Sequence, residues 1–197
     1  LEMPYFGSRH ESAAIAMADG YTRISDTFAV ATTTQGPGLT NALTALIAAR
    51  KSQTPLVFAV GDVSAHQEGW PQDIDHRALF EAAGVPLLEI QDADTAFSET
   101  VQAVRTAIHT RTPIGINMPV DFQELEWVPW NDDTDTTIEG RSLDFTGDLE
   151  SAANALAGAK RPVIIAGRGA VEAGCGAQLV DLGDRIGALY ATTLKGK

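Results

Sequence analysis

Cysteine is nearly missing from this sequence, which holds a single one, Cys175, among 197 residues. One cysteine excludes an internal disulfide and any metal site built from several thiolates. Such scarcity fits a reducing compartment, so we expect a cytoplasmic protein. The sequence also lacks an apolar run of the roughly 20 residues that a membrane helix needs. Its first residues lack the basic-then-apolar pattern of a signal peptide.

Basic residues are scarce relative to acidic ones. Lys and Arg total 14 against 26 Asp and Glu, which gives a formal net charge of −12 at pH 7. A chain of this charge is repelled by polyanions, so neither nucleic acid nor an anionic membrane surface is an expected partner. Hydrophobic residues reach 44%. That content suffices for a packed core in one large domain, or in one domain and part of another.

Strand-like and helix-like patterns alternate through residues 1–124. Short apolar or β-branched runs predict strands, and apolar residues at helical spacing predict helices between them. The predicted strands are 28–34, 54–62, 86–90 and 112–121, and the predicted helices are 8–24, 39–53, 76–84 and 92–110. Strand-helix-strand units imply parallel pairing, so we expect an α/β domain with a parallel sheet flanked by helices. The first helix is so rich in alanine that we expect it to be buried on more than one side.

Residues 125–146 break this alternation. They are acidic, interrupted by proline and poor in aliphatic side chains, which is typical of an interdomain linker, and they include Asp132, Asp133 and Asp135. Residues 147–197 predict the start of a second, Rossmann-like α/β domain, with helices at 148–160 and 175–187 and strands at 161–170 and from 188. Because two strands do not make a stable domain, we expect this domain to be incomplete at its C-terminal end. We expect the first domain to be incomplete at its N-terminal end, so that the sequence is a piece of a longer protein.

Glu11 is the first candidate for chemistry. It follows Arg9 and His10 directly and opens the alanine-rich helix. One interpretation is structural, because an acid in the first turn of a helix interacts favourably with the helix dipole. The other is functional, because a carboxyl held among apolar side chains gains proton affinity and can share a proton with a ligand.

A glycine-rich turn, QGPG, separates a predicted strand from a predicted helix at Gln35–Gly38. One interpretation is a plain tight turn between the two elements. Backbone N–H groups at such a turn can also bind phosphate, but the stretch matches neither common phosphate-loop pattern and Pro37 removes one donor. As a binding site, the turn suits a flat, uncharged ring better than a phosphate.

Other motifs are weaker. The glycines of Ala166–Gly174 do not fit the dinucleotide fingerprint, and binding of NAD or FAD through Gly167–Gly169 is kept as an alternative. Three histidines show no metal-ligand spacing with one another and are interpreted as surface or loop residues: His66, His76 and His109. We therefore predict no metal site within this chain.

In their order and spacing, several stretches resemble the pyrimidine-binding domain of thiamine diphosphate enzymes of the acetolactate synthase and pyruvate oxidase-like family. The stretches are RHESAAIAMADGYTR, TTTQGPGLTNALTALIAA and TPLVFAVGD, and the resemblance extends over residues 8–124. Residues 161–197 resemble the start of that family's central domain. The resemblance implies a transferase or lyase that uses thiamine diphosphate and Mg²⁺ to decarboxylate a 2-keto acid and, in some members, to ligate the aldehyde unit to an acceptor.

The resemblance also implies residue roles. Glu11 matches the glutamate that hydrogen-bonds N1′ of the cofactor's aminopyrimidine and thereby activates the cofactor. Thr34, Pro37 and Asn41 match residues that line the pyrimidine pocket, and Gln72 matches a glutamine that faces the reacting centre. Around Gln72 the sequence departs from acetolactate synthases, because the loop is shorter and no phenylalanine precedes the glutamine.

The Gly-Asp-Gly…Asn motif through which this family binds the diphosphate and Mg²⁺ is absent from these residues. The resemblance therefore implies a site completed by another domain, in a homodimer or homotetramer, and a fragment that is inactive alone. Some members of the family also carry FAD in the central domain. Two alternatives stay open: a family member acting on a sulfo-aldehyde, oxalyl-CoA or an aromatic keto acid, and a catalytically silent α/β module.

Overall fold

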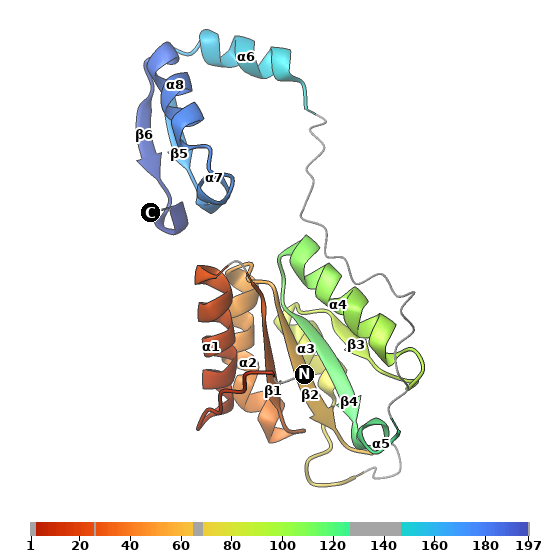
Figure 1. Cartoon of the computed structure of the whole chain (residues 1–197). Helices are drawn as coiled ribbons and strands as arrows, with labels where there is room; N and C mark the ends of the chain where they lie inside the picture. Colours follow the sequence, from red (N-terminus) through yellow and green to blue (C-terminus); the bar gives the residue numbers. More distant parts are fainter. Residues whose placement is uncertain (1–2, 26, 65–68, 127–146, 197) are drawn as a thin grey trace. The chain divides into compact units, whose positions relative to one another are not determined.

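The structure is a computed structural model of the chain and describes residues 3–25, 27–64, 69–126 and 147–196. The chain divides into two compact units, residues 1–141 and 142–197, which are described separately (Figure 1). The division falls within the stretch predicted as a linker. Most of that stretch, with its three aspartates, lies outside the described residues.

The first unit is a four-stranded parallel sheet with helices on both faces (Figure 1). Its strands are β1 (Ala29–Thr33), β2 (Leu56–Asp62), β3 (Leu87–Glu89) and β4 (Ile114–Pro119). They lie in the order β1-β2-β4-β3, and each neighbouring pair is parallel. Every strand lies inside its predicted range, and the predicted α/β fold with a parallel sheet is confirmed.

Local sequence explains where the helices of this unit begin and end. They are α1 (Glu11–Ile24), α2 (Pro37–Lys51), α3 (His76–Ala83), α4 (Ala96–Thr110) and the short α5 (Val120–Gln123). The Asp75 carboxylate caps α3 by accepting a hydrogen bond from the Ala78 N–H at 2.9 Å. Gly84 ends α3 in the left-handed conformation that glycine adopts most readily. Among the described residues, no helix is both long enough and apolar enough to cross a membrane.

Two buried clusters, one on each face of the sheet, form the core of the unit. Residues of α1, α2 and α3 pack on one face, and residues of α4 pack on the other (Figure 1). Along β2 the side chains alternate, so that Leu56, Phe58 and Val60 join the first cluster and Val57 joins the second. Apolar side chains on both faces are the mark of a central strand in a parallel sheet.

The burial of α1 differs from the expectation. The alanine-rich sequence predicts a helix buried on more than one side, but only Ile15 and Ala18 are buried. Met17 and Tyr21 keep 45% and 53% of their accessible surface. The reason is that α1 packs mainly against α2 and β1, which together cover a single stripe of the helix.

The second unit is a two-stranded parallel sheet with short helices. Strand β5 (Val163–Ala166) pairs with β6 (Leu189–Thr192), and the helices are α6 (Leu149–Ala157), α7 (Arg168–Glu172), α8 (Gly176–Ile186) and the 3₁₀ turn η1 (Leu194–Gly196). The Asp148 carboxylate caps α6, and its hydrogen bonds from the Ser151 hydroxyl and N–H lower the pKa of Asp148 below its ordinary value. Among the described residues of this unit only Gly183 is buried, so the unit has almost no core.

Gly115 of β4 and Gly20 of α1 form a matched pair of test sites. A methyl group at Gly115 would collide with the Phe80 ring, whereas one at Gly20 would meet nothing within 4 Å. We expect Gly115→Ala to lower the free energy of unfolding by about 1–3 kcal/mol, the usual cost of overpacking a core. Gly20→Ala should raise it by about 0.5–1 kcal/mol, because alanine is the better helix former. Urea unfolding followed by circular dichroism measures both changes, and equal effects would contradict the packing of Phe80 on β4.

Candidate functional site

The glycine-rich turn between β1 and α2 lies at the carboxyl end of the sheet, where the loops that follow parallel strands meet. Gly36 has φ of +57° and ψ of −109°, a conformation that is open to glycine and unfavourable for other residues. A side chain at Gly36 would also collide with the backbone carbonyl oxygen of Gln72. Glycine is therefore required here for the turn to lie directly against the segment that precedes α3.

Glu11 lies in the first turn of α1 and contacts the first turns of α2. Its Oε2 accepts a hydrogen bond from Nδ2 of Asn41 at 3.2 Å. The other carboxylate oxygen, Oε1, has no hydrogen-bond partner in the part of the chain that the structure describes. The side chain keeps 30% of its accessible surface, so a carboxyl enclosed by apolar groups is not what the structure shows. The alanines that follow Glu11 point in different directions around the helix and do not cover its carboxylate. On one side the carboxylate contacts Asn41 of α2.

Gln72 reaches the same turn from the other side. Its Oε1 accepts a hydrogen bond from Nε2 of Gln35 at 3.1 Å, and its backbone packs on Gly36. Because Gln35 takes up the carbonyl oxygen of the Gln72 amide, the NH₂ group of that amide points elsewhere and is available as a donor. The structure thus brings together two segments that are 37 residues apart in the sequence.

Thr34 and Pro37 flank Gly36, and both side chains are exposed. Pro37 is the first residue of α2, a position where the missing N–H is not needed. The predicted site residues form two groups at the N-terminal end of α2: Glu11 with Asn41, and Thr34, Pro37 and Gln72 around the turn.

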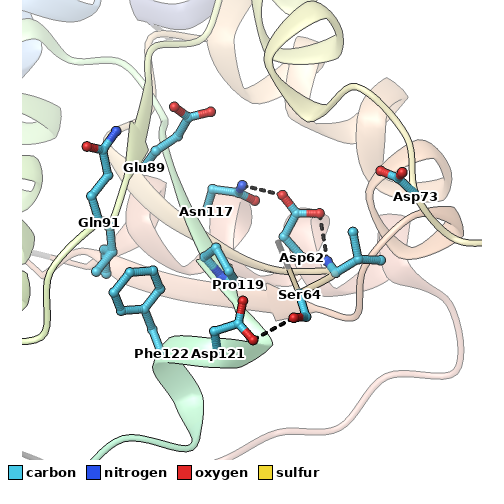
Figure 2. A pocket seen from close by; sticks show the side chains of 11 residues that line it. Asp62, Ser64, Asp73, Glu89, Gln91, Asn117, Pro119, Asp121 and Phe122 are labelled. Carbon is cyan, nitrogen blue, oxygen red and sulfur yellow. Dashed lines mark hydrogen bonds between the residues drawn. The ribbon is translucent and has the colours of Figure 1, made fainter. Parts of the chain in front are cut away.

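An open pocket of about 480 Å³ lies at the carboxyl ends of β2, β3 and β4 (Figure 2). The Asp62 carboxylate accepts a hydrogen bond from Nδ2 of Asn117 at 2.5 Å (Figure 2). It also accepts one from the backbone N–H of Val63 at 2.8 Å. Asp121 accepts a hydrogen bond from the Ser64 hydroxyl at 2.6 Å on the same wall. The side chain of Phe122 supplies an apolar surface to the pocket.

This pocket is acidic. Among the residues that the structure describes, its lining includes four carboxylates and neither lysine nor arginine: Asp62, Asp73, Glu89 and Asp121. Arg77, which is outside the lining, pairs with Glu89. Within the described ranges, no group of three or more acidic, histidine or cysteine side chains is arranged to hold a metal ion. The negative lining repels anionic groups such as a diphosphate.

His76 corrects an interpretation of the sequence. Instead of being a surface or loop residue, it is the first residue of α3 and only 3% exposed. Its Nδ1 lies 2.8 Å from Oδ1 of Asn117, itself buried in β4. The asparagine inside the apolar run IGINMP could have indicated a buried polar partner, because a buried amide needs hydrogen-bond partners. Of the other two histidines, His109 is exposed and His66 lies outside the described residues.

The glycine stretch of the second unit does not form a nucleotide-binding turn. Residues Arg168–Glu172 fold as the short helix α7, with the Arg168 guanidinium paired to the Glu172 carboxylate at 2.8 Å. The dinucleotide motif requires a tight turn that leads from a strand into a long helix. In the described part of this unit, the turn after β5 leads into only five helical residues.

Two family models match separate parts of the chain. Residues 1–79 match the thiamine pyrophosphate enzyme N-terminal TPP binding domain, and residues 149–197 match the central domain of the same enzymes. The chain belongs to the thiamine pyrophosphate enzymes. The first matched range contains α1, the glycine-rich turn and Gln72, so both groups of predicted site residues lie within it.

The relatives of this thiamine pyrophosphate enzyme chain are named as a synthase, a decarboxylase and a lyase, and the chain matches about a third of the length of the first two. The chain is 28% identical over 200 residues to the acetolactate synthase large subunit of Haemophilus influenzae (95% of this chain, 34% of that protein). It is 30% identical over 202 residues to the "Probable 2-ketoarginine decarboxylase" of Pseudomonas aeruginosa (96% and 35%). It is 36% identical over 137 residues to 2-hydroxyacyl-CoA lyase 2 of Danio rerio (63% and 21%).

A solved structure shows the same fold. The X-ray structure of a candidate thiamin diphosphate-dependent enzyme from Mycobacterium smegmatis superposes with a TM-score of 0.74 at 22% identity. The match covers 95% of this chain and 37% of that one. The chain therefore spans about a third of the length of the curated relatives that it matches.

Gly36→Ala tests the close approach of the turn to Gln72, and Gly84→Ala serves as its control. Both glycines have positive φ, +57° and +66°, but only the new methyl group at Gly36 meets a neighbour. We expect Gly84→Ala to cost about 1–2 kcal/mol, the price of the left-handed conformation. Gly36→Ala should cost about 1–3 kcal/mol more, because its ψ of −109° lies outside the left-handed region and its methyl group collides with the backbone of Gln72. Urea denaturation measures both, and equal losses would contradict the contact between the turn and Gln72.

Proposed function

We propose that the chain is part of an acetolactate synthase-like enzyme that uses thiamine diphosphate to decarboxylate a 2-keto acid and transfers the aldehyde unit to an acceptor. The names of its relatives support this proposal, because they include a synthase, a decarboxylase and a lyase. The observation that carries it is the Glu11–Asn41 pair at the N-terminal end of α2, within the range matched by the TPP binding domain.

The residues present fit the pyrimidine end of thiamine diphosphate. Asn41 holds one oxygen of the Glu11 carboxylate and leaves Oε1 open to a ring nitrogen. A carboxyl with one open oxygen can hold or release a proton there. Thr34 and Pro37, both exposed and uncharged, offer contacts to a flat ring. When bound, the cofactor supplies the electron sink for the loss of CO₂.

The diphosphate and Mg²⁺ are, in this proposal, held by residues outside this chain. Support comes from the acidic pocket, where the described lining residues include no lysine or arginine to receive a diphosphate. The site is then completed by another domain, in a homodimer or homotetramer. The single cysteine favours a cytoplasmic enzyme. Whether the enzyme also carries FAD is tested by the visible absorption spectrum of the purified full-length protein, because a bound flavin absorbs visible light.

A second candidate is the same chemistry on another substrate, such as oxalyl-CoA, a sulfo-aldehyde or an aromatic keto acid. The 36% identity to a 2-hydroxyacyl-CoA lyase favours an acyl-CoA among these. A panel of 2-keto acids and acyl-CoA substrates on the full-length enzyme separates them. A catalytically silent module would bind no thiamine diphosphate in calorimetry with Mg²⁺.

Glu11→Gln is the direct test of the mechanism, with Glu81→Gln on the exposed face of α3 as its control. Glutamine keeps the shape and can still hydrogen-bond a ring nitrogen, but it cannot exchange the proton. We expect turnover by the full-length enzyme to fall by about 10²–10⁴-fold, the usual contribution of a general acid-base group. Circular dichroism should be unchanged, and Glu81→Gln should keep wild-type turnover. Unchanged turnover in Glu11→Gln would remove this mechanism.

A further inference from the structure

His76 connects the glycine-rich turn to the acidic pocket through the interior of the first unit. The two nitrogens of its buried ring face different elements. Nε2 accepts a hydrogen bond from the backbone N–H of Gly36 at 3.4 Å, and Nδ1 lies 2.8 Å from Oδ1 of Asn117. The Nδ2 of Asn117 donates in turn to Asp62, which lines the pocket. The three side chains form a continuous path from the turn to the pocket.

The chemistry at both ends of this path decides which nitrogen of His76 carries the proton. At one end, the backbone N–H of Gly36 can only donate, so Nε2 must be the unprotonated nitrogen. At the other end, the ionised Asp62 carboxylate can only accept, so Asn117 turns its NH₂ group toward Asp62 and its carbonyl oxygen toward His76. The carbonyl oxygen requires a donor, so Nδ1 carries the hydrogen. Oδ2 of Asp62 also lies 3.8 Å from Nδ1 and likewise favours a hydrogen on that nitrogen. The contacts of the two ring nitrogens therefore specify the same neutral tautomer.

We propose that His76 is a positioning residue, which in its neutral Nδ1–H form holds the Gly36 turn at the N-terminal end of α2 and links it to Asp62 and Asn117. The tautomer follows from the hydrogen bonds alone. The consequence for cofactor binding rests on the proposed function, because the turn and α2 carry the residues assigned to the pyrimidine pocket.

The turn needs this acceptor for a physical reason. No side chain caps the N-terminus of α2, and Gly36 is buried, so its N–H cannot turn to water. A buried N–H without a partner is costly, and His76 supplies the acceptor. A shift of the turn would move Pro37 and with it the start of α2, from which Asn41 reaches Glu11. His76 thus acts on the candidate site without touching Glu11.

The tautomer is measured first, by long-range ¹H–¹⁵N correlation spectra of the protein labelled with ¹⁵N-histidine at neutral pH. We expect His76 to show a protonated Nδ1 and an unprotonated Nε2. A protonated Nε2, in either the other tautomer or the imidazolium, would overturn the proposal. This measurement requires no cofactor, so its failure is distinct from a failure of the proposed function.

The positioning role is tested by comparing His76→Gln with His76→Asn in the full-length enzyme. A glutamine amide reaches the place of Nε2 and can accept from Gly36, whereas an asparagine amide reaches only the place of Nδ1 and can still serve Asn117. We expect His76→Asn to raise the Kd and KM for thiamine diphosphate about 3- to 10-fold above those of His76→Gln, the size of one lost hydrogen bond. The kcat at saturating cofactor should be similar in the two variants.

Stability is the control for this comparison. Both variants lose the same ring, and each leaves one buried group without a partner: the Gly36 N–H in His76→Asn and the Asn117 carbonyl oxygen in His76→Gln. Their urea midpoints should therefore be similar. Equal thiamine diphosphate affinities at matched stability would show that the ring only fills space, and would overturn the positioning role. Should neither variant fold, the ¹⁵N spectra of the wild-type protein decide the proposal.

Discussion

Parallel register is the constraint on which this site depends. Strands β1, β2 and β4 run side by side in one direction, with Thr33 opposite Val60 and Asp62 opposite Pro119. Whatever follows these strands must therefore emerge at one edge of the sheet. The glycine-rich turn leaves β1 there, Asp62 ends β2 there, and Asn117 lies near the end of β4. Segments that the chain separates by dozens of residues become neighbours through backbone pairing alone.

Much of the fold could be predicted from the sequence because its signals are local. Each predicted strand of the first unit contains an observed one, and the helix predicted over 76–84 is observed at His76–Ala83 with Gly84 as its C-cap. The turn was recognisable from Gln35–Gly38 for the same reason. The short helix α5 was not predicted, because Pro119 is both the last residue of β4 and the N-cap of α5, and the proline indicated only the end of the strand.

The predictions about the burial of His76 and Glu11 were wrong, because burial depends on contacts between residues that are distant in the sequence. A histidine next to a predicted loop carries no local mark of burial, and only the crossing of α3 over the sheet encloses His76. Alanines beside Glu11 suggested an enclosed carboxyl, yet adjacent residues on a helix point in different directions, and burial is decided by what packs on each. Asn41, 30 residues away, is what contacts Glu11 in this structure.

The proposed function explains two features together: the partial exposure of the Glu11 carboxylate and the acidic lining of the pocket. A carboxyl exchanges a proton with a ring most effectively where water is excluded, and the described residues leave 30% of the Glu11 side chain exposed. A diphosphate needs cationic groups, and the pocket at this sheet edge offers carboxylates instead. Under that proposal, one further surface that closes over α1 and carries Mg²⁺ would meet both needs. The same helix exposes Met17 and Tyr21, apolar side chains that such a surface would cover. On this argument the chain supplies the proton-exchanging half of a site, and the charge-neutralising half comes from the surface that closes it.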